Sequence, residues 1–203
     1  MRRDQLVRGL QSVPLPPDPL APLEQVGTPA EAAVDLLLAL DRTVGLRDRS
    51  VADLGSGTGR LAIGAALMGA RPVAGVEVDE RLLPIAKKAA LTLGAEVEWV
   101  VSDVTDWNRR TEVIVMNAPF GAQTRHADRP FWERAFSLAD RAVGAFASSA
   151  SRTFIARLAL DRGAHVIEVG PVPWNLPRTF AHHRAANVRL AVDRWVLETE
   201  SKP

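Results

Sequence analysis

Short apolar segments alternate with segments of helical periodicity along most of this chain, and that alternation constrains the fold more than any other feature. Strands are expected at residues 50–54, 72–77, 97–101, 113–116 and near 144–149. Helices are expected at residues 28–44, 61–68, 82–93, 130–143 and 152–162. Strands that alternate with helices form a mostly parallel sheet, so the sequence predicts an α/β fold with helices on both faces of that sheet.

The two ends of the chain depart from this alternation. Two final strands, at 165–169 and 188–197, are separated by a Pro-rich loop without a helical pattern, which predicts an antiparallel hairpin at one edge of the sheet. Residues 11–23 carry five prolines and should run extended over the surface, because proline is disfavoured inside helices. We therefore expect one domain over residues 1–203, in which residues 1–23 form a Pro-rich N-terminal extension.

Proline residues also mark the expected helix boundaries. Thr28 is a plausible N-cap, with Pro29 at the first helical position and Glu31 completing a capping box. Pro84 implies that its helix starts late or is kinked. After Pro130, one helical face is expected to carry Trp132, Ala135, Phe136, Ala139 and Val143.

The composition narrows the possible functions. Because the chain has no cysteine, disulfides, thiolate metal sites and a cysteine nucleophile are excluded, and a cytoplasmic location fits. No apolar run reaches the roughly 20 residues of a membrane span, and polar residues follow Arg2 and Arg3 where an export signal would be apolar. With a net charge of +1, a polyanionic partner would have to be held by local basic patches.

A Gly-rich turn, residues 53–59, follows the first predicted strand and is typical of a nucleoside site. Gly55 and Gly57 would let the backbone approach a ligand closely, while Thr58 and Arg60 would open the following helix. The turn lacks the third glycine of the dinucleotide fingerprint, which counts against a nicotinamide cofactor.

Carboxylates follow the neighbouring strands. Glu77 ends the second strand, where it can accept hydrogen bonds from both hydroxyls of a ribose, and Asp103 follows the third strand, where it can accept from an adenine amino group. The alternatives are a solvated residue at position 77 and a turn-forming aspartate at position 103. Asp53 either touches the ligand or orients the glycine turn.

The motif Asn117-Ala118-Pro119-Phe120 closes the fourth strand and predicts a pocket for a flat group that carries an amine. Asn117 Oδ1 and the Ala118 carbonyl would accept hydrogen bonds from the amine, Pro119 would aim that carbonyl, and Phe120 would stack on the ring. A simple turn after a buried strand is the alternative explanation.

Basic side chains cluster in two loops, which we expect to form a cationic rim for phosphates. The residues are Arg125, His126, Arg129, Arg178, His182, His183 and Arg184. Scattered solvated charge is the alternative. The histidines lack further ligands at metal-site spacing, so no metal site is expected.

These motifs resemble the methyltransferase-like protein 5 family, whose members modify adenine N6 in small-subunit ribosomal RNA. The likeness runs from about Leu23 to Leu197 and is carried by residues 23–29, 51–59, 114–121, 148–152 and 176–183. It implies a seven-stranded Rossmann-like methyltransferase sheet that binds S-adenosylmethionine.

The resemblance also implies roles for individual residues. Gln25 and Thr28 would touch the methionine end of the cofactor. Further cofactor contacts would come from Gly55, Thr58, Arg60, Glu77, Asp103 and Val104, beside the Gly57 of the glycine turn. Ala118 stands where the family usually has a proline; its carbonyl is kept, but the loop is expected to be less stiff.

A partner is also implied by the resemblance, because eukaryotic members pair a sheet edge with a small zinc-binding activator. If the third strand is that edge, Val97, Trp99 and Val101 form one candidate face; a buried core strand explains these residues equally well.

Three other functions compete with adenine-N6 methylation of RNA. Release-factor glutamine-N5 methyltransferases share the acceptor motif but usually carry an N-terminal helical domain. A DNA adenine methyltransferase would need a target-recognition domain, and none is visible here. A non-catalytic RNA- or protein-binding module would not need the intact set of polar positions.

Overall fold

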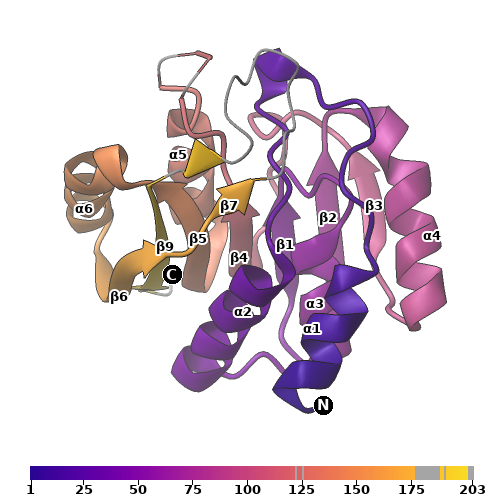
Figure 1. Cartoon of the computed structure of the whole chain (residues 1–203). Helices are drawn as coiled ribbons and strands as arrows, with labels where there is room; N and C mark the ends of the chain where they lie inside the picture. The colour runs from indigo at the N-terminus through magenta and orange to yellow at the C-terminus, as the bar shows by residue number, and fades with distance from the viewer. Residues whose placement is uncertain (122, 125, 177–187, 190, 201–203) are drawn as a thin grey trace.

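The structure is a computed structural model that describes residues 1–121, 123–124, 126–176, 188–189 and 191–200. Its centre is a seven-stranded sheet in the order β3-β2-β1-β4-β5-β9-β6 (Figure 1). The strands are β1 Val51–Leu54, β2 Val73–Glu77, β3 Glu98–Val101, β4 Thr111–Asn117, β5 Ala139–Ser148, β6 Ala164–Val172 and β9 Val192–Thr199. A separate short pair is formed by β7 Asn175–Leu176 and β8 Val188–Arg189.

Strands β3, β2, β1, β4 and β5 run parallel, whereas β9 is antiparallel to both β5 and β6. The predicted antiparallel edge hairpin is therefore confirmed, with β9 inserted between β5 and the edge strand β6. The strand order reverses between β1 and β4. Ligands of such sheets bind beyond the carboxyl ends of the strands at this switch point, where the glycine turn and Asn117 both lie.

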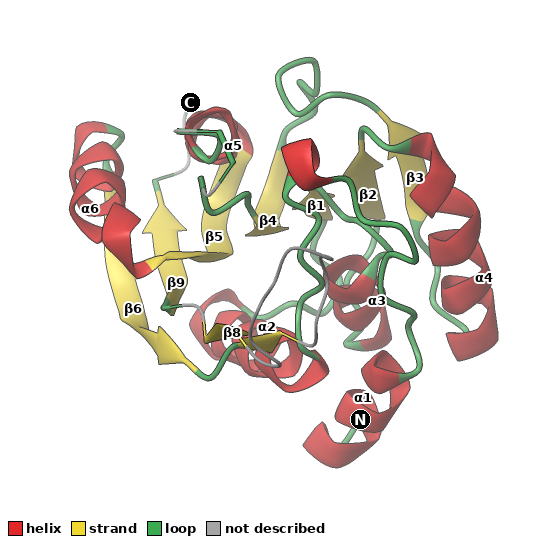
Figure 2. Cartoon of the chain, turned by 45° about the horizontal axis from the view of Figure 1, so that its top comes forward, coloured by secondary structure: helices red, strands yellow, loops and turns green. Residues whose placement is uncertain are grey.

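Helices cover both faces of the sheet (Figure 2). The α-helices are α1 Arg3–Gln11, α2 Ala30–Val44, α3 Arg60–Leu67, α4 Leu83–Leu93, α5 Arg129–Leu138 and α6 Arg152–Asp161. Short 3-10 turns occupy Ala21–Leu23, Glu80–Leu82 and Ser149–Ser151. One apolar core joins α1, α2 and α3 to one face of the sheet, and a second core joins α5 and α6 to the other face.

The N-terminal residues differ from the prediction. Residues 3–11 form α1, whose buried side chains Leu6, Val7 and Leu10 pack into the first core. Residues 1–23 are thus not a plain surface extension. The prolines do keep the chain out of an α-helix from Ser12 to Leu20, as expected, but Val13 in this stretch is buried.

Two helix boundaries also need correction. Helix α5 ends at Leu138, so Ala139 and Val143 belong to β5 and not to the helical face that carries Trp132. Strand β5 is buried on both sides over most of its length, and a continuous apolar run does not distinguish a buried strand from a buried helix. The segment predicted as one strand at 188–197 contains two, β8 and β9.

The start of α2 also lacks the predicted capping box. The helix begins at Ala30 with Pro29 as its N-cap, and no side chain caps it. Thr28 instead lies beside the cavity described below. The late start predicted from Pro84 is confirmed, because α4 begins at Leu83 after a 3-10 turn.

Strand β3 forms one edge of the sheet. The candidate partner face of Val97, Trp99 and Val101 is not uniformly exposed. Trp99 packs over the glycine turn, because a Cβ added to Gly59 would lie only 2.3 Å from its ring. Val101, in contrast, is 54% exposed. Val97 precedes the strand. Among the described residues, no helix combines the length and the apolar character that a membrane span requires.

Candidate active site

A cavity of about 420 Å³ opens at the carboxyl ends of β1, β2, β3 and β4. It brings together every residue predicted to contact a cofactor: Gln25, Thr28, Asp53, Gly55, Gly57, Thr58, Arg60, Glu77, Asp103 and Val104. Asn117 and Pro119 of the acceptor motif line the same cavity. The cofactor and acceptor motifs, which are far apart in sequence, therefore meet in one site.

The glycine turn has the backbone that its sequence predicts. Gly55 and Gly57 adopt positive φ angles of 70° and 56°, which side chains rarely allow. A Cβ on Gly55 would also lie 2.9 Å from the ring of Phe131, another residue of the cavity wall. Both features make glycine necessary at position 55.

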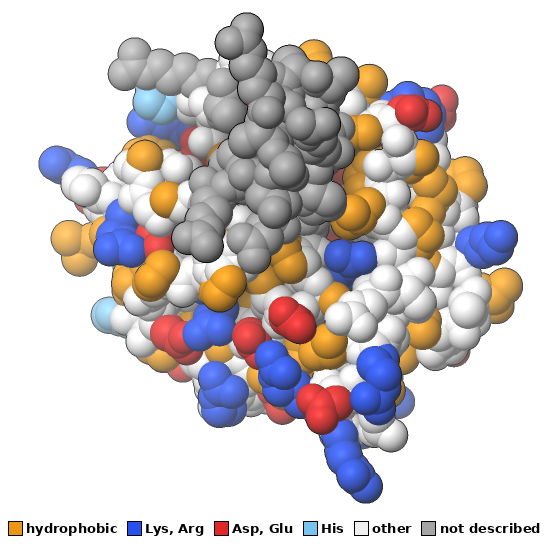
Figure 3. Space-filling view, viewed as in Figure 1, with side chains coloured by type: hydrophobic (Ala, Val, Ile, Leu, Met, Phe, Trp, Pro, Cys, Tyr) orange, Lys and Arg blue, Asp and Glu red, His pale blue; other side chains and the backbone are white. Residues whose placement is uncertain are grey.

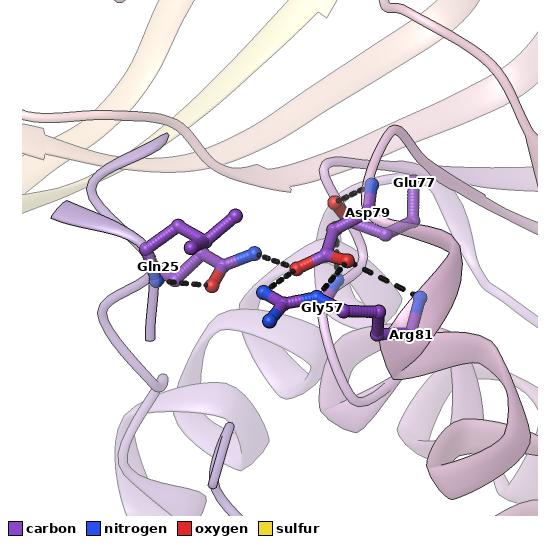
Figure 4. Close-up of polar contacts among 6 residues, drawn as sticks. Gln25, Gly57, Glu77, Asp79 and Arg81 are labelled. Atoms are coloured by element: carbon purple, nitrogen blue, oxygen red, sulfur yellow. Dashed lines mark hydrogen bonds and ion pairs between the residues drawn. The ribbon is translucent and has the colours of Figure 1, made fainter. Parts of the chain in front are cut away.

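Glu77 holds the turn from the end of β2 (Figure 4). Its carboxylate accepts hydrogen bonds from the backbone N–H groups of Gly57, at 2.7 Å, and Asp79, at 2.9 Å. Burial raises the pKa of Glu77, and the backbone hydrogen bonds oppose that rise. Each carboxylate oxygen can accept a second hydrogen bond, so Glu77 remains able to receive hydroxyl groups.

Gln25 extends this network to the N-terminal part of the chain. Its Nε2 donates to Asp79 at 2.8 Å, and its Oε1 accepts from the Leu20 N–H at 2.7 Å (Figure 4). The Arg81 guanidinium holds the pKa of the Asp79 carboxyl well below its usual range. Each end of the Gln25 amide makes one of these bonds and keeps a second N–H donor or acceptor site, so Gln25 remains able to contact a cofactor.

Asp53 is fully buried and orients the helix after the glycine turn. Its Oδ2 accepts from the Ala62 N–H at 2.9 Å, in the first turn of α3. Its Oδ1 has no partner among the described residues. Burial, together with the nearby Glu77 charge, raises the pKa of Asp53 to about 7. The residue therefore supports the turn and keeps a spare acceptor.

Side chains of α3 and of the glycine turn fasten residues 13–28, which we call the strap. The Arg60 guanidinium donates to the carbonyls of Val13 and Thr28, and the Thr58 hydroxyl donates to the Pro14 carbonyl at 2.6 Å. Burial lowers the pKa of Arg60, which has no ion-pair partner within the described chain. The strap residues Leu15, Pro16 and Pro22 form part of the cavity wall.

Asp103 makes a local turn. Its Oδ1 accepts from the backbone N–H and the hydroxyl of Thr105, at 2.8 and 2.6 Å, and these bonds lower the pKa of Asp103. The turn-forming alternative is thus correct for one oxygen. Asp103 also lines the cavity, beside the buried side chain of Val104.

Asn117 presents a fixed amide to the site. Its Nδ2 donates to the Val26 carbonyl at 2.8 Å, and a carbonyl oxygen can bond only to the NH₂ end of an amide. Asn117 Oδ1 is therefore the free end; it is buried and has no partner in the described part of the chain. A buried acceptor without a donor is costly, so this atom is suited to receive a donor from a ligand.

The other residues of the acceptor motif are arranged differently. Ala118 is buried and Pro119 lines the cavity. The Phe120 ring is not part of the cavity wall: it packs edge-on against Trp174, with ring centroids 5.8 Å apart. Stacking of Phe120 on a substrate ring stays a prediction, and it would require the ring to turn.

Glu24 was not identified from the sequence, although it lies in the first segment that carries the family resemblance. It is 8% exposed, and its carboxylate accepts from the N–H groups of Phe120, at 2.8 Å, and Gln123, at 2.7 Å. At the other end of the loop, Ser151 donates to Asp128 at 3.0 Å. The loop after the acceptor motif is thus held by two buried carboxylates.

The predicted basic rim is described only in part. His126 and Arg129 are exposed, and Arg129 lies 3.6 Å from Glu133. Arg125, Arg178, His182, His183 and Arg184 lie outside the described residues. Over α1 and α2, basic and acidic side chains intermingle (Figure 3), as in the pair Arg3–Asp35.

In the described residues, no three side chains gather as metal ligands.

Known proteins resemble this chain over most of its length. A family model described as the methyltransferase small domain matches residues 30–144. The chain is 30% identical to the rRNA N6-adenosine-methyltransferase metl-5 of Caenorhabditis elegans, covering 86% of this chain and 87% of the relative. It is 29% identical to the rRNA N6-adenosine-methyltransferase Mettl5 of Drosophila melanogaster, covering 87% and 86%.

A solved structure agrees with these matches. The crystal structure of PH1948 from Pyrococcus horikoshii superposes with a TM-score of 0.90 and 32% sequence identity, covering 98% of both chains. Together the matches confirm the fold, the enzyme class and the cofactor, S-adenosylmethionine, that the sequence predicted. The chain belongs to the methyltransferase small-domain family and, within it, to the methyltransferase-like protein 5 family.

Proposed function

We propose that this protein transfers a methyl group from S-adenosylmethionine to N6 of an adenosine in RNA, and that the RNA is that of the small ribosomal subunit. The names of two relatives that match most of the chain support the adenosine acceptor. The observation that carries the proposal is the buried, unpaired Oδ1 of Asn117, which lines the same cavity as the glycine turn.

The residues around the cavity fit the parts of the cofactor. Glu77 would receive the ribose hydroxyls and Asp103 the adenine amino group. Arg60, a partly buried cation without an ion-pair partner in the described chain, would attract the carboxylate, and the unpaired Oδ1 of Asp53 would receive the ammonium. When bound, S-adenosylmethionine supplies a methyl group made electrophilic by its sulfonium.

The acceptor residues would make the amine reactive. The lone pair of an aromatic amine is delocalised into the ring, so the amine is a weak nucleophile. Hydrogen bonds from its N–H groups to Asn117 Oδ1 and to the Ala118 carbonyl would favour the pyramidal geometry in which the lone pair is available. No strong base is required, because the amine is neutral and loses its proton after transfer. Most of the rate enhancement would come from positioning.

Ribosomal RNA would bind at the opening of the cavity and insert its target base there. An adenosine in a helical stem would have to flip out, at a cost of a few kcal/mol. His126 and Arg129, which are exposed after the acceptor motif, would contact the neighbouring phosphates. With a ribosomal substrate, the place of action would be the cytoplasm. A small zinc-binding activator would cover the β3 edge, where Val101 is exposed.

One alternative acceptor has structural support. The primary amide of a glutamine side chain also presents N–H groups, and it needs no stacking aromatic. Because Phe120 packs against Trp174 and not into the cavity, methylation of a protein glutamine is the second candidate.

The decisive experiment incubates the purified protein with labelled cofactor and unmodified small ribosomal subunits, followed by nucleoside mass spectrometry. The expected product is N6-methyladenosine at one site. Asn117→Ala should be inactive. Asn108→Ala is the matched control and should stay active, because Asn108 is exposed and lies outside the cavity. Label on a protein glutamine, or on no adenosine, would contradict the proposal.

A further inference from the structure

Glu24 is an unusual carboxylate because it is nearly buried and its described partners are backbone amides. The residue has a left-handed backbone, with φ of 48°, at the end of the 3-10 turn Ala21–Leu23. Its Oε2 accepts from the Phe120 N–H at 2.8 Å, and its Oε1 accepts from the N–H groups of Gln123, at 2.7 Å, and Thr124, at 3.4 Å. No cation pairs with it among the described residues.

These contacts have an energetic consequence. A carboxylate removed from water is costly unless hydrogen bonds compensate for the lost hydration. Here the compensating donors belong to Phe120, the last residue of the acceptor motif, and to Gln123 and Thr124 in the loop after it, which we call the acceptor loop. Bonds from amides to an ionised carboxylate are about twice as strong as neutral ones. The position of that loop and the burial of Glu24 therefore depend on each other.

Three consecutive strap residues reach both parts of the site. Glu24 binds the acceptor loop, Gln25 binds Asp79 beyond the end of β2, and the Val26 carbonyl fixes the amide of Asn117. The Ala118 carbonyl thus lies in a short stretch that is pinned to the strap on both sides, at Asn117 and at Phe120. This pinning matters because alanine at 118 restrains the backbone less than proline would.

We propose that Glu24 is a positioning residue for methyl transfer, which holds the Ala118 carbonyl and the acceptor loop in the geometry that receives the amine. The inference rests on the proposed function of the site as an amine methyltransferase. Glu24 also lines the cavity, but both of its carboxylate oxygens are bonded to backbone N–H groups of Phe120, Gln123 and Thr124, so Glu24 acts on the amine through these bonds. Its loss therefore affects the acceptor step more than cofactor binding.

The test is Glu24→Gln, which keeps the size of the side chain and removes its charge. Steady-state transfer to the RNA substrate is measured together with cofactor affinity by calorimetry. Because hydrogen bonds to a charged group contribute more than neutral ones, we expect kcat/KM for RNA to fall by about tenfold or more. Cofactor affinity is expected to stay near that of the wild type.

Amide hydrogen exchange gives a second readout that does not need activity. The N–H groups of Phe120 and Gln123 should exchange faster in Glu24→Gln by about tenfold. Glu31→Gln is the matched control, since Glu31 is an exposed carboxylate nearby on α2, and it should leave both readouts unchanged. If Glu24→Gln does not fold, Glu24→Asp keeps the charge on a shorter side chain and is expected to show the same pattern more weakly.

Two results would overturn the role of Glu24: transfer by the folded variant at the wild-type rate, or a loss of cofactor affinity as large as the loss of transfer. The second result would make Glu24 a support of the cofactor cavity. Failure of the wild-type protein to methylate any RNA would instead reject the proposed function, and the exchange measurement would still decide whether Glu24 holds the loop.

Discussion

The cofactor side and the acceptor side of the cavity are assembled in different ways. On the cofactor side, the hydrogen bonds that shape the strand ends have the shorter separations: 20 positions for Gly57–Glu77, 9 for Asp53–Ala62 and 2 for Asp103–Thr105. The bonds of this side that reach the strap are longer, as in Gln25–Asp79 at 54 positions. On the acceptor side the separations are 91 for Val26–Asn117 and 96 for Glu24–Phe120. The glycine turn is thus held largely by its own neighbourhood, whereas the acceptor motif depends on the distant strap.

This contrast separates two functions that one cavity must combine. Local bonds at strand ends persist as long as the sheet is intact, so cofactor contacts with Glu77 and Asp103 should tolerate changes in the strap better than those with Gln25 and Thr28, which belong to the strap. Long-range bonds require the strap to be in place. We therefore expect changes on the two sides to have separable effects on cofactor affinity and on methyl transfer.

The largest expected effect comes from Asn117→Ala. The variant removes the acceptor atom at the reacting amine and should reduce transfer by about 100-fold or more, since misplacement of a reacting group alone costs that much. Cofactor affinity, measured by calorimetry, should stay near that of the wild type. A fully active variant would show that Asn117 does not orient the substrate.

The next largest effect is expected for Glu77→Ala on the cofactor side. Removal of a carboxylate that receives hydroxyl groups and also holds Gly57 should weaken cofactor binding by about 10- to 100-fold. Glu80→Ala, at an exposed position three residues away, is the control. Unchanged binding in a calorimetric titration would remove Glu77 from the cofactor site.

A smaller effect concerns the pH dependence of stability. Because the pKa of Asp53 is raised to about 7 in the folded protein, the folded state retains a proton that the unfolded state releases above about pH 4. The free energy of unfolding of the cofactor-free protein should fall as pH rises from 5 to 7, by at most about 1.4 kcal/mol per unit from this group.

Asp53→Asn should reduce that slope in urea unfolding measured at several pH values. Some slope should remain, because burial also raises the pKa of Glu77 and its contribution has the same sign. An identical slope in the variant would mean that Asp53 is ionised throughout this range in the folded protein.

The smallest effect is expected at the rim. Arg129→Ala should weaken RNA binding a few-fold and reduce the salt dependence of the affinity by about one phosphate contact. Cofactor affinity should not change. Arg8→Ala, an exposed position on α1, serves as the control in the same filter-binding assay. Equal losses in both variants would point to a diffuse charge effect and not to a rim.

The contrast also explains how much of the molecule the sequence could predict. Gly55, Glu77 and Asp103 lie at or within two residues of a strand end, so a local pattern was sufficient to place them at one edge of the sheet. Glu24 has no such pattern, because its partners lie almost a hundred positions away. Its only signal was its place next to Gln25 in a segment shared with the family.

Other differences have equally specific physical causes. Helix α1 precedes the prolines, and its three buried side chains are too few to stand out from a polar segment. Ala139 and Val143 continued the helical spacing of α5 into a strand buried on both faces, where the two periodicities cannot be told apart. The place of the Phe120 ring depends on Trp174, which no short-range rule relates to it.

The bond from Asn117 to the Val26 carbonyl has a consequence for how the enzyme would treat edited RNA. With one N–H of its NH₂ end bonded to that carbonyl, the amide keeps Oδ1 as its buried, unpaired acceptor at the cavity. Inosine carries an oxo group where adenosine carries the amine, so two oxygens would face each other and repel. Deamination of the target adenosine would thus remove the nucleophile and also prevent the base from settling in the pocket.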